Sequence, residues 1–249
     1  MIILNKLHEN KPVAFFDVDG TIFNGHCITE FPKPLLEKHL FPKKQLQILL
    51  ETKRDFENGK IDYFDSGVKI QTAYAKGIIG KRQKDVLKVG YEYFLNEGKK
   101  KLFKFTERLI GILKNNGYVI ILESGSPYEI IRPIGDFLGV DYIFASQYKM
   151  KYRVFVDSPP EFLFSETLAE KKRERAIDFI NIHSSDVKNS IGFGDSGSDI
   201  LFMKELGNAV AILPKPDLEK TAIKNQWLIC DQEDQVIEQV KGLLNRLNQ

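Results

Sequence analysis

The 249-residue sequence has few cysteines and no long apolar run. Cys27 and Cys230 lie far apart and form no CxxC or Cys/His spacing, so the sequence suggests neither a disulfide framework nor a zinc site. No run reaches the roughly 20 apolar residues of a membrane span, so we expect no membrane partner. The stretch up to Pro12 mixes polar and charged residues among its apolar ones. With reduced cysteines, this predicts a cytoplasmic protein.

The sequence also lacks an excess of either charge. Lys and Arg total 36 against 34 Asp and Glu, a formal net charge of +2. Such a balance creates no field that would favour nucleic acid, and it says nothing about oligomeric state. With 43% hydrophobic residues, the chain can bury the core of one large domain or of a domain with an insertion.

Short apolar runs recur along the chain, and three of them stop at acidic, serine or glycine residues. Such runs are typical of parallel strands buried on both faces. They are Val13–Phe16, Tyr118–Leu122 and Ser190–Phe193, with weaker ones at Tyr142–Ala145, Ala209–Leu213 and Trp227–Cys230. Segments with helical spacing separate them, so we predict a doubly wound, Rossmann-like α/β sheet.

A long stretch after the first strand shows no strand signal. Helical patterns with Gly and Pro between them cover Pro42–Asn58, Tyr63–Lys76 and Lys81–Asn96. We therefore predict an all-helical cap over residues 25–98, with residues 1–24 and 99–249 forming the catalytic core. Tyr148–Val156 alternates apolar with polar residues and predicts a small hairpin at the sheet edge.

Carboxylates follow two of the predicted strands. Asp17 and Asp19 end the first, and Asp195 and Asp199 follow Ser190–Phe193. In an open α/β sheet these strand ends meet at one rim, where several carboxylates repel one another unless a cation neutralises them. An all-oxygen site suits Mg²⁺, which takes substrate phosphate oxygens as further ligands. The pattern thus predicts a magnesium site for phosphoryl transfer on a small phosphorylated substrate.

The order of the residues suggests a division of roles. Asp17 is placed to attack phosphorus and form an aspartyl-phosphate. Asp19, two residues on, can protonate the leaving oxygen and later activate water. Ser124 at the end of the second strand, the backbone N–H groups after it and a lysine would stabilise the equatorial oxygens. The basic run that begins Lys171-Lys172 supplies candidate lysines.

These motifs together resemble the haloacid dehalogenase superfamily, specifically its phosphoserine-phosphatase-like branch with a helical cap inserted after the first motif. The first motif is Asp17-Val18-Asp19-Gly20-Thr21, the second Leu122–Pro127 and the fourth Gly192–Asp199. The resemblance implies Mg²⁺ held by the Asp17 carboxylate, the Asp19 main-chain oxygen and Asp195, with Asp199 in support. It also implies phosphate binding around Gly20, Thr21, Ser124 and Gly125.

The remaining motif and the cap depart from that branch. The third motif is a lysine whose glycine neighbours are missing here; apolar Ala176 and Phe179 fit the family's helix better from Lys172 than from Lys171. The arginine that true phosphoserine phosphatases use for the serine carboxylate falls on Val68, and their early cap glutamate on His26. We therefore expect phosphoserine to be a poor substrate and His26 to contact the leaving group.

Three alternatives stay open at this point. Gly192-Phe193-Gly194-Asp195-Ser196-Gly197 spells a dinucleotide-binding G-x-G-x-x-G after a strand, although Asp195 would then face a pyrophosphate. A non-enzymatic Mg²⁺-dependent phospho-acceptor also combines carboxylates and a lysine on a parallel sheet. A phosphotransferase would use the same aspartyl-phosphate as a phosphatase.

Overall fold

A six-stranded parallel sheet organises the chain, as the computed structural model shows for residues 10–158 and 168–249. The strand order is β3-β2-β1-β6-β7-β8, and every neighbouring pair is parallel. The strands are β1 (Val13–Phe16), β2 (Val119–Pro127), β3 (Tyr142–Ser146), β6 (Ile191–Gly194), β7 (Asn208–Ile212) and β8 (Leu228–Cys230). The six apolar runs of the sequence therefore all form strands of this sheet.

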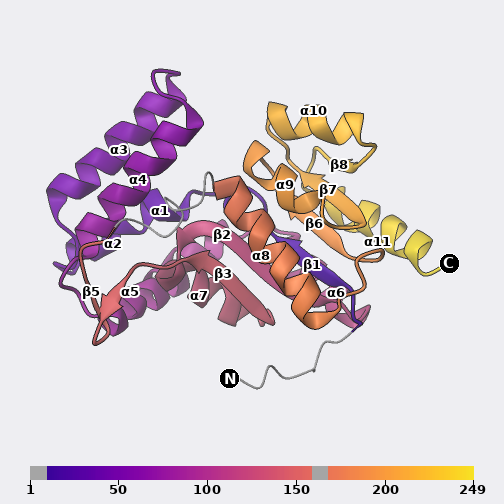
Figure 1. Cartoon of the computed structure of the whole chain (residues 1–249), viewed down its shortest axis with the longest axis horizontal. Helices are drawn as coiled ribbons and strands as arrows, with labels where there is room; N and C mark the ends of the chain where they lie inside the picture. Colours follow the sequence, from indigo (N-terminus) through magenta and orange to yellow (C-terminus); the bar gives the residue numbers. More distant parts are fainter. Residues whose placement is uncertain (1–9, 159–167) are drawn as a thin grey trace.

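Helices cover both faces of the sheet (Figure 1). Alternate side chains of β1 enter two separate apolar clusters: Ala14 and Phe16 pack in one, Val13 and Phe15 in the other. The first cluster includes side chains of α6 (Thr106–Asn115), α7 (Tyr128–Leu138) and α11 (Val236–Leu247). The second includes those of α8 (Leu168–His183), α9 (Ile200–Met203) and α10 (Pro216–Lys224). This confirms the predicted doubly wound α/β fold.

Between β1 and β2 the chain is helical, as predicted. The helices are α1 (Cys27–Glu30), α2 (Pro32–Glu37), α3 (Lys43–Glu57), α4 (Tyr63–Ile78), α5 (Gln83–Asn96) and the short η1 (Gly98–Lys101). We call α1 to α5 the helical insertion. In Figure 1, α3 and α4 lie side by side and stand away from the sheet. At the start of α4, the Asp62 side chain accepts a hydrogen bond from Asp65 N at 2.7 Å and so caps the helix. That the insertion acts as a lid stays a prediction.

Two features differ from the sequence-based expectations. β2 runs on to Pro127, past the predicted end at Leu122, and its register with β3 shifts between Glu123 and Pro127. The predicted hairpin forms, as β4 (Met150–Lys151) and β5 (Val154–Phe155), but it is a separate two-stranded sheet and not part of the main sheet's edge. Its backbone instead bonds to residues 80–83, where Phe155 N donates to Lys81 O at 3.0 Å. The hairpin therefore joins the insertion to the core.

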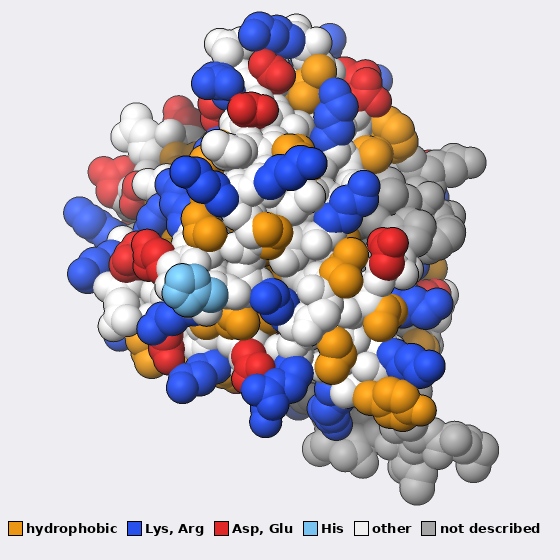
Figure 2. Space-filling model, turned by 90° about the vertical axis from the view of Figure 1, so that its left-hand side faces the viewer, with side chains coloured by type: hydrophobic (Ala, Val, Ile, Leu, Met, Phe, Trp, Pro, Cys, Tyr) orange, Lys and Arg blue, Asp and Glu red, His pale blue; other side chains and the backbone are white. Residues whose placement is uncertain are grey.

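Figure 2 shows the face built largely by the insertion. Lys and Arg side chains are spread across it with acidic side chains between them, and apolar side chains occur singly or in small groups. This distribution matches the balanced composition of the chain. Of the helices in the described parts of the chain, none combines the length and apolar character that crossing a membrane requires.

Candidate active site

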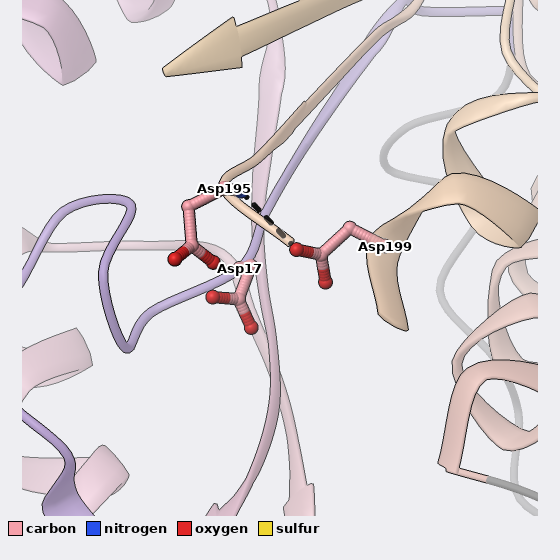
Figure 3. Close-up of side chains that lie close together, drawn as sticks. All are labelled: Asp17, Asp195 and Asp199. Carbon is pink, nitrogen blue, oxygen red and sulfur yellow. Dashed lines mark hydrogen bonds between the residues drawn. The ribbon is translucent and has the colours of Figure 1, made fainter. Parts of the chain in front are cut away.

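The carboxyl ends of β1 and β6 bring three aspartates together. Because β1 and β6 are parallel neighbours, Asp17 after β1 lies beside Asp195 after β6. Asp199 reaches the same point from the short helix η3 (Gly197–Asp199). One carboxylate oxygen from each residue lies within 4.8 Å of those of the other two, and all three side chains are buried (Figure 3). The structure thus groups three of the four predicted metal-site residues.

Lys172 lies inside this cluster and Lys171 does not. Lys172 Nζ is 2.5 Å from Asp17 Oδ1 and 2.7 Å from Asp199 Oδ1, and only 2% of the residue is exposed. Lys171 pairs instead with Glu174 at the surface, at 3.3 Å. α8 therefore places a buried cation against Asp17 and Asp199, and its phosphate-stabilising role stays a prediction.

Both carboxylate oxygens of Asp199 accept hydrogen bonds. Its Oδ2 accepts from Asp195 N at 3.2 Å and from Ser196 N at 3.0 Å, and its Oδ1 accepts from Lys172. The Ser196 side chain accepts in return from the backbone at Asp199, which completes a capping box. The arrangement fixes the loop that presents Asp195, so the structure favours a supporting role for Asp199.

Burial and mutual repulsion dominate the electrostatics of the cluster. Burial raises the pKa of Asp17 well above its usual value, with Asp199 and Asp195 acting in the same direction and Lys172 opposing them. Burial likewise raises the pKa of Asp195 to about 6, again with help from Asp199. Lys172 and the more exposed Lys215, which pairs with Asp195, are two positive charges against three carboxylates, so the site favours a further cation.

The carboxylate of Asp19 is held by donors from the insertion and from β2. Its Oδ1 accepts from Cys27 N at 2.8 Å, and its Oδ2 accepts from the Ser126 hydroxyl at 2.5 Å. Ser126 Oγ in turn accepts from Ile28 N at 3.1 Å. These contacts fix the orientation of the Asp19 side chain, and its acid/base role stays a prediction.

The other residues predicted for phosphate binding lie on the loop after β1 and on its parallel neighbour β2. Thr21 Oγ1 donates to Asp17 Oδ2 at 3.3 Å, and Ser124 is completely buried, its Oγ accepting from Ser126 N at 3.0 Å. Gly20 has a φ of +88°, and a Cβ there would lie 2.2 Å from Asp195 Oδ2. Only glycine fits so close to that carboxylate.

Comparison with known proteins decides the family. Residues 14–204, about three quarters of the chain, match the sequence model of the haloacid dehalogenase-like hydrolases. The chain belongs to this family. The matched span runs from β1 past Asp199, so it includes every residue of the cluster.

Its relatives in this hydrolase family include two proteins named phosphoserine phosphatases. That of Methanocaldococcus jannaschii is 25% identical over 219 residues, covering 87% of this chain and 92% of the relative. Phosphoserine phosphatase SerB1 of Mycobacterium tuberculosis is 25% identical over 220 residues, covering 88% of this chain and 70% of the relative. A solved structure of a substrate-bound phosphoserine phosphatase complex matches with a TM-score of 0.65 at 22% identity, covering 94% of this chain and 98% of that one. The chain is therefore an enzyme of the phosphoserine-phosphatase-like branch, which confirms the resemblance seen in its motifs.

His26 lies at the start of α1, on the insertion side of the hydrolase site. A hydrogen bond of 3.1 Å joins its Nδ1 to Thr29 Oγ1. Burial lowers its pKa; Asp19 acts in the opposite direction, while Lys53 and Lys215 lower it further. A neutral imidazole next to Asp19 can contact a leaving group, and this role stays a prediction.

Three further groups at the site were not among the predicted residues. Lys215, between β7 and α10, places its Nζ 2.7 Å from Asp195 Oδ2; its position after a strand end was the signal that could have found it. Ser126 orients Asp19. Glu123, fully buried next to Ser124, pairs with Arg175 of α8 at 3.0 Å.

The residues present fit a magnesium ion. The donor set is all oxygen and rich in carboxylate, as Mg²⁺ requires. Both oxygens of Asp199 accept hydrogen bonds, and so do both oxygens of Asp17, from Lys172 and Thr21. In the described parts of the chain, Asp195 pairs with Lys215 through Oδ2 alone, and that lysine side chain is 64% exposed. Asp195 therefore has the carboxylate oxygen most open to an ion, and the part of Asp17 in holding it stays a prediction.

Proposed function

We propose that this hydrolase is a Mg²⁺-dependent phosphomonoesterase that acts on a small phosphorylated metabolite through an aspartyl-phosphate at Asp17. The observation that carries the proposal is the placement of Asp17. It is buried beside Asp195 and accepts hydrogen bonds from Lys172 and Thr21, and it follows β1, whose parallel neighbour β2 carries Ser124. When a nucleophile attacks phosphorus, negative charge spreads over the phosphoryl oxygens, and cationic groups close to these oxygens stabilise it.

In the first step an Asp17 oxygen attacks phosphorus and the bond to the leaving alcohol breaks. Asp19, held by Ser126 and Cys27 N, donates the proton that the alcohol oxygen takes up. In the second step Asp19 accepts a proton from water, which attacks the phosphoryl group and releases inorganic phosphate and free Asp17.

The surrounding groups supply positioning and charge stabilisation. Lys172, the Ser124 hydroxyl and backbone N–H groups near Gly125 would hold the equatorial oxygens as negative charge spreads over them. Mg²⁺, held by Asp17, Asp195 and the Asp19 carbonyl, would neutralise further negative charge when bound.

The test is a panel of phosphorylated metabolites incubated with the purified protein and Mg²⁺, with release of inorganic phosphate as the readout. We expect turnover of at least one compound and none by Asp17→Asn, because an amide is not a nucleophile for phosphorus. Transfer of the phosphoryl group to an added alcohol in place of phosphate release would indicate a phosphotransferase. Turnover by Asp17→Asn within about tenfold of wild type would refute the assignment.

A further inference from the structure

One line of residues on α4 faces the core. Tyr63, Gly67 and Gln71 are four residues apart and so follow one side of the helix. At the inner end, Gln71 Nε2 donates to Gly125 O at 2.6 Å. At the outer end, the Tyr63 hydroxyl lies near the aspartate cluster: burial raises its pKa, and Ser198, Lys172 and Asp199 also act on that pKa. The line therefore spans the distance between β2 and η3.

Gln71 and Tyr63, at the two ends of the line, lie close to segments that contain active-site residues. Gly125 directly follows Ser124, and Ser198 Oγ donates to Asp199 Oδ1 at 3.3 Å. Burial increases along the line, because Tyr63 is 52% exposed whereas Gln71 is 5% exposed. α4 thus extends along the site from its rim inward, and we infer that the alcohol leaving a phosphoryl group bound at Asp17 lies beside this line.

Gly67 lies at the middle of the line and leaves space there. A Cβ built at Gly67 has no other heavy atom within 4 Å apart from its own local helix and chain neighbours. Glycine in a helix interior costs stability relative to alanine, and no neighbouring atom occupies the space that a Cβ would take. Neither helix propensity nor close packing therefore explains a glycine at this position. The side chains on either side, Tyr63 and Gln71, are uncharged. The open space is therefore bordered on α4 by neutral groups.

We propose that Gly67 is a specificity-determining residue that makes room for a leaving alcohol larger than serine and without charge, of the size of a sugar ring. This inference rests on the proposed phosphomonoesterase activity. It predicts that ring-sized phosphomonoesters are preferred over phosphoserine, in line with the neutral side chain of Val68 on the same helix.

The experiment compares Gly67→Leu with a matched control, Gly111→Leu. Gly111 is also a glycine inside a helix, α6, outside the insertion and with no heavy atom near a built Cβ. Both variants should melt at or above the wild-type temperature, because leucine is the better helix former. The probes are hexose 6-phosphates and p-nitrophenyl phosphate as large substrates, and glycerol 3-phosphate and phosphoserine as small ones.

We expect Gly67→Leu to lower kcat/KM for the large probes by about ten- to hundredfold while the small probes change by less than about threefold. Gly67→Ala should give a smaller loss in the same direction, and Gly111→Leu no change in preference. An equal effect on both classes, no effect, or a melting temperature of Gly67→Leu below wild type would overturn the inference while leaving the phosphatase intact. A wild-type protein that hydrolyses no phosphomonoester would instead overturn the proposed function on which the inference rests.

Discussion

Replacing Ser126 by alanine tests how Asp19 is positioned. The Ser126 hydroxyl donates to Asp19 Oδ2 at 2.5 Å and accepts from Ile28 N at 3.1 Å, and the contact from Cys27 N to Oδ1 at 2.8 Å would remain. A hydrogen bond to a charged group contributes about 1.5–3 kcal/mol. If the variant loses that energy in the transition state in which the leaving alcohol is protonated, kcat/KM falls by about ten- to 150-fold.

The leaving group provides the discriminating assay. The ratio kcat/KM reports steps up to departure of the alcohol, and p-nitrophenolate departs without a proton whereas an alkyl alcohol needs one. The loss in Ser126→Ala should therefore be large for alkyl phosphates and several-fold smaller for p-nitrophenyl phosphate. Equal losses for both substrates, or a loss below about threefold for alkyl phosphates, would refute the proposed acid/base role of Asp19 and its positioning by Ser126.

Three further predictions concern the buried charges and the ion. Lys172→Met leaves Asp17 and Asp199 without their shared cation, so without metal the free energy of unfolding should fall by about 3 kcal/mol in urea titrations; an unchanged value contradicts the pairing. Burial raises the pKa of Glu123 from 4.5 to about 7, although Arg175 opposes this shift. The folded state therefore holds the Glu123 proton more tightly than the unfolded state does. The resulting contribution to the free energy of unfolding, about 3 kcal/mol, is fully present below pH 4.5 and is lost as pH rises through 7. Glu123→Gln should remove that part of the pH dependence of unfolding, and identical pH profiles for variant and wild type would refute it. Chelation should stop turnover, with Mg²⁺ restoring it and Ca²⁺ doing so poorly because of its looser coordination; full activity in excess chelator would exclude a required ion.

The alternation of apolar runs and helical segments predicted the sheet, and the carboxylates after two of these runs predicted the clustered aspartates. Parallel strands align their carboxyl ends, so the positions of Asp17 and Asp195 in the sequence specify their proximity in space. The choice between Lys171 and Lys172 depended on the family resemblance and on the apolar spacing of the helix. The structure brings the second of these lysines to the site.

The contacts that sequence reasoning missed join residues far apart along the chain. Ser126 and Asp19 are 107 residues apart, and Arg175 and Glu123 are 52 apart. Neither pair follows a local spacing rule, because each depends on how two elements pack. The hairpin shows the same limit: alternation predicted β4 and β5, but only packing places them against residues 80–83.

The central claim is that Asp17 carries the phosphoryl group during turnover. Rapid acid quenching of the enzyme with Mg²⁺ and its best substrate from the panel, followed by mass spectrometry of the peptide that contains Asp17, tests it directly. We expect the mass of one phosphoryl group on Asp17 in the wild type and none in Asp17→Asn. A phosphoryl group on another residue, or steady turnover with no covalent intermediate detectable when chemistry is faster than hydrolysis of the intermediate, would contradict the account.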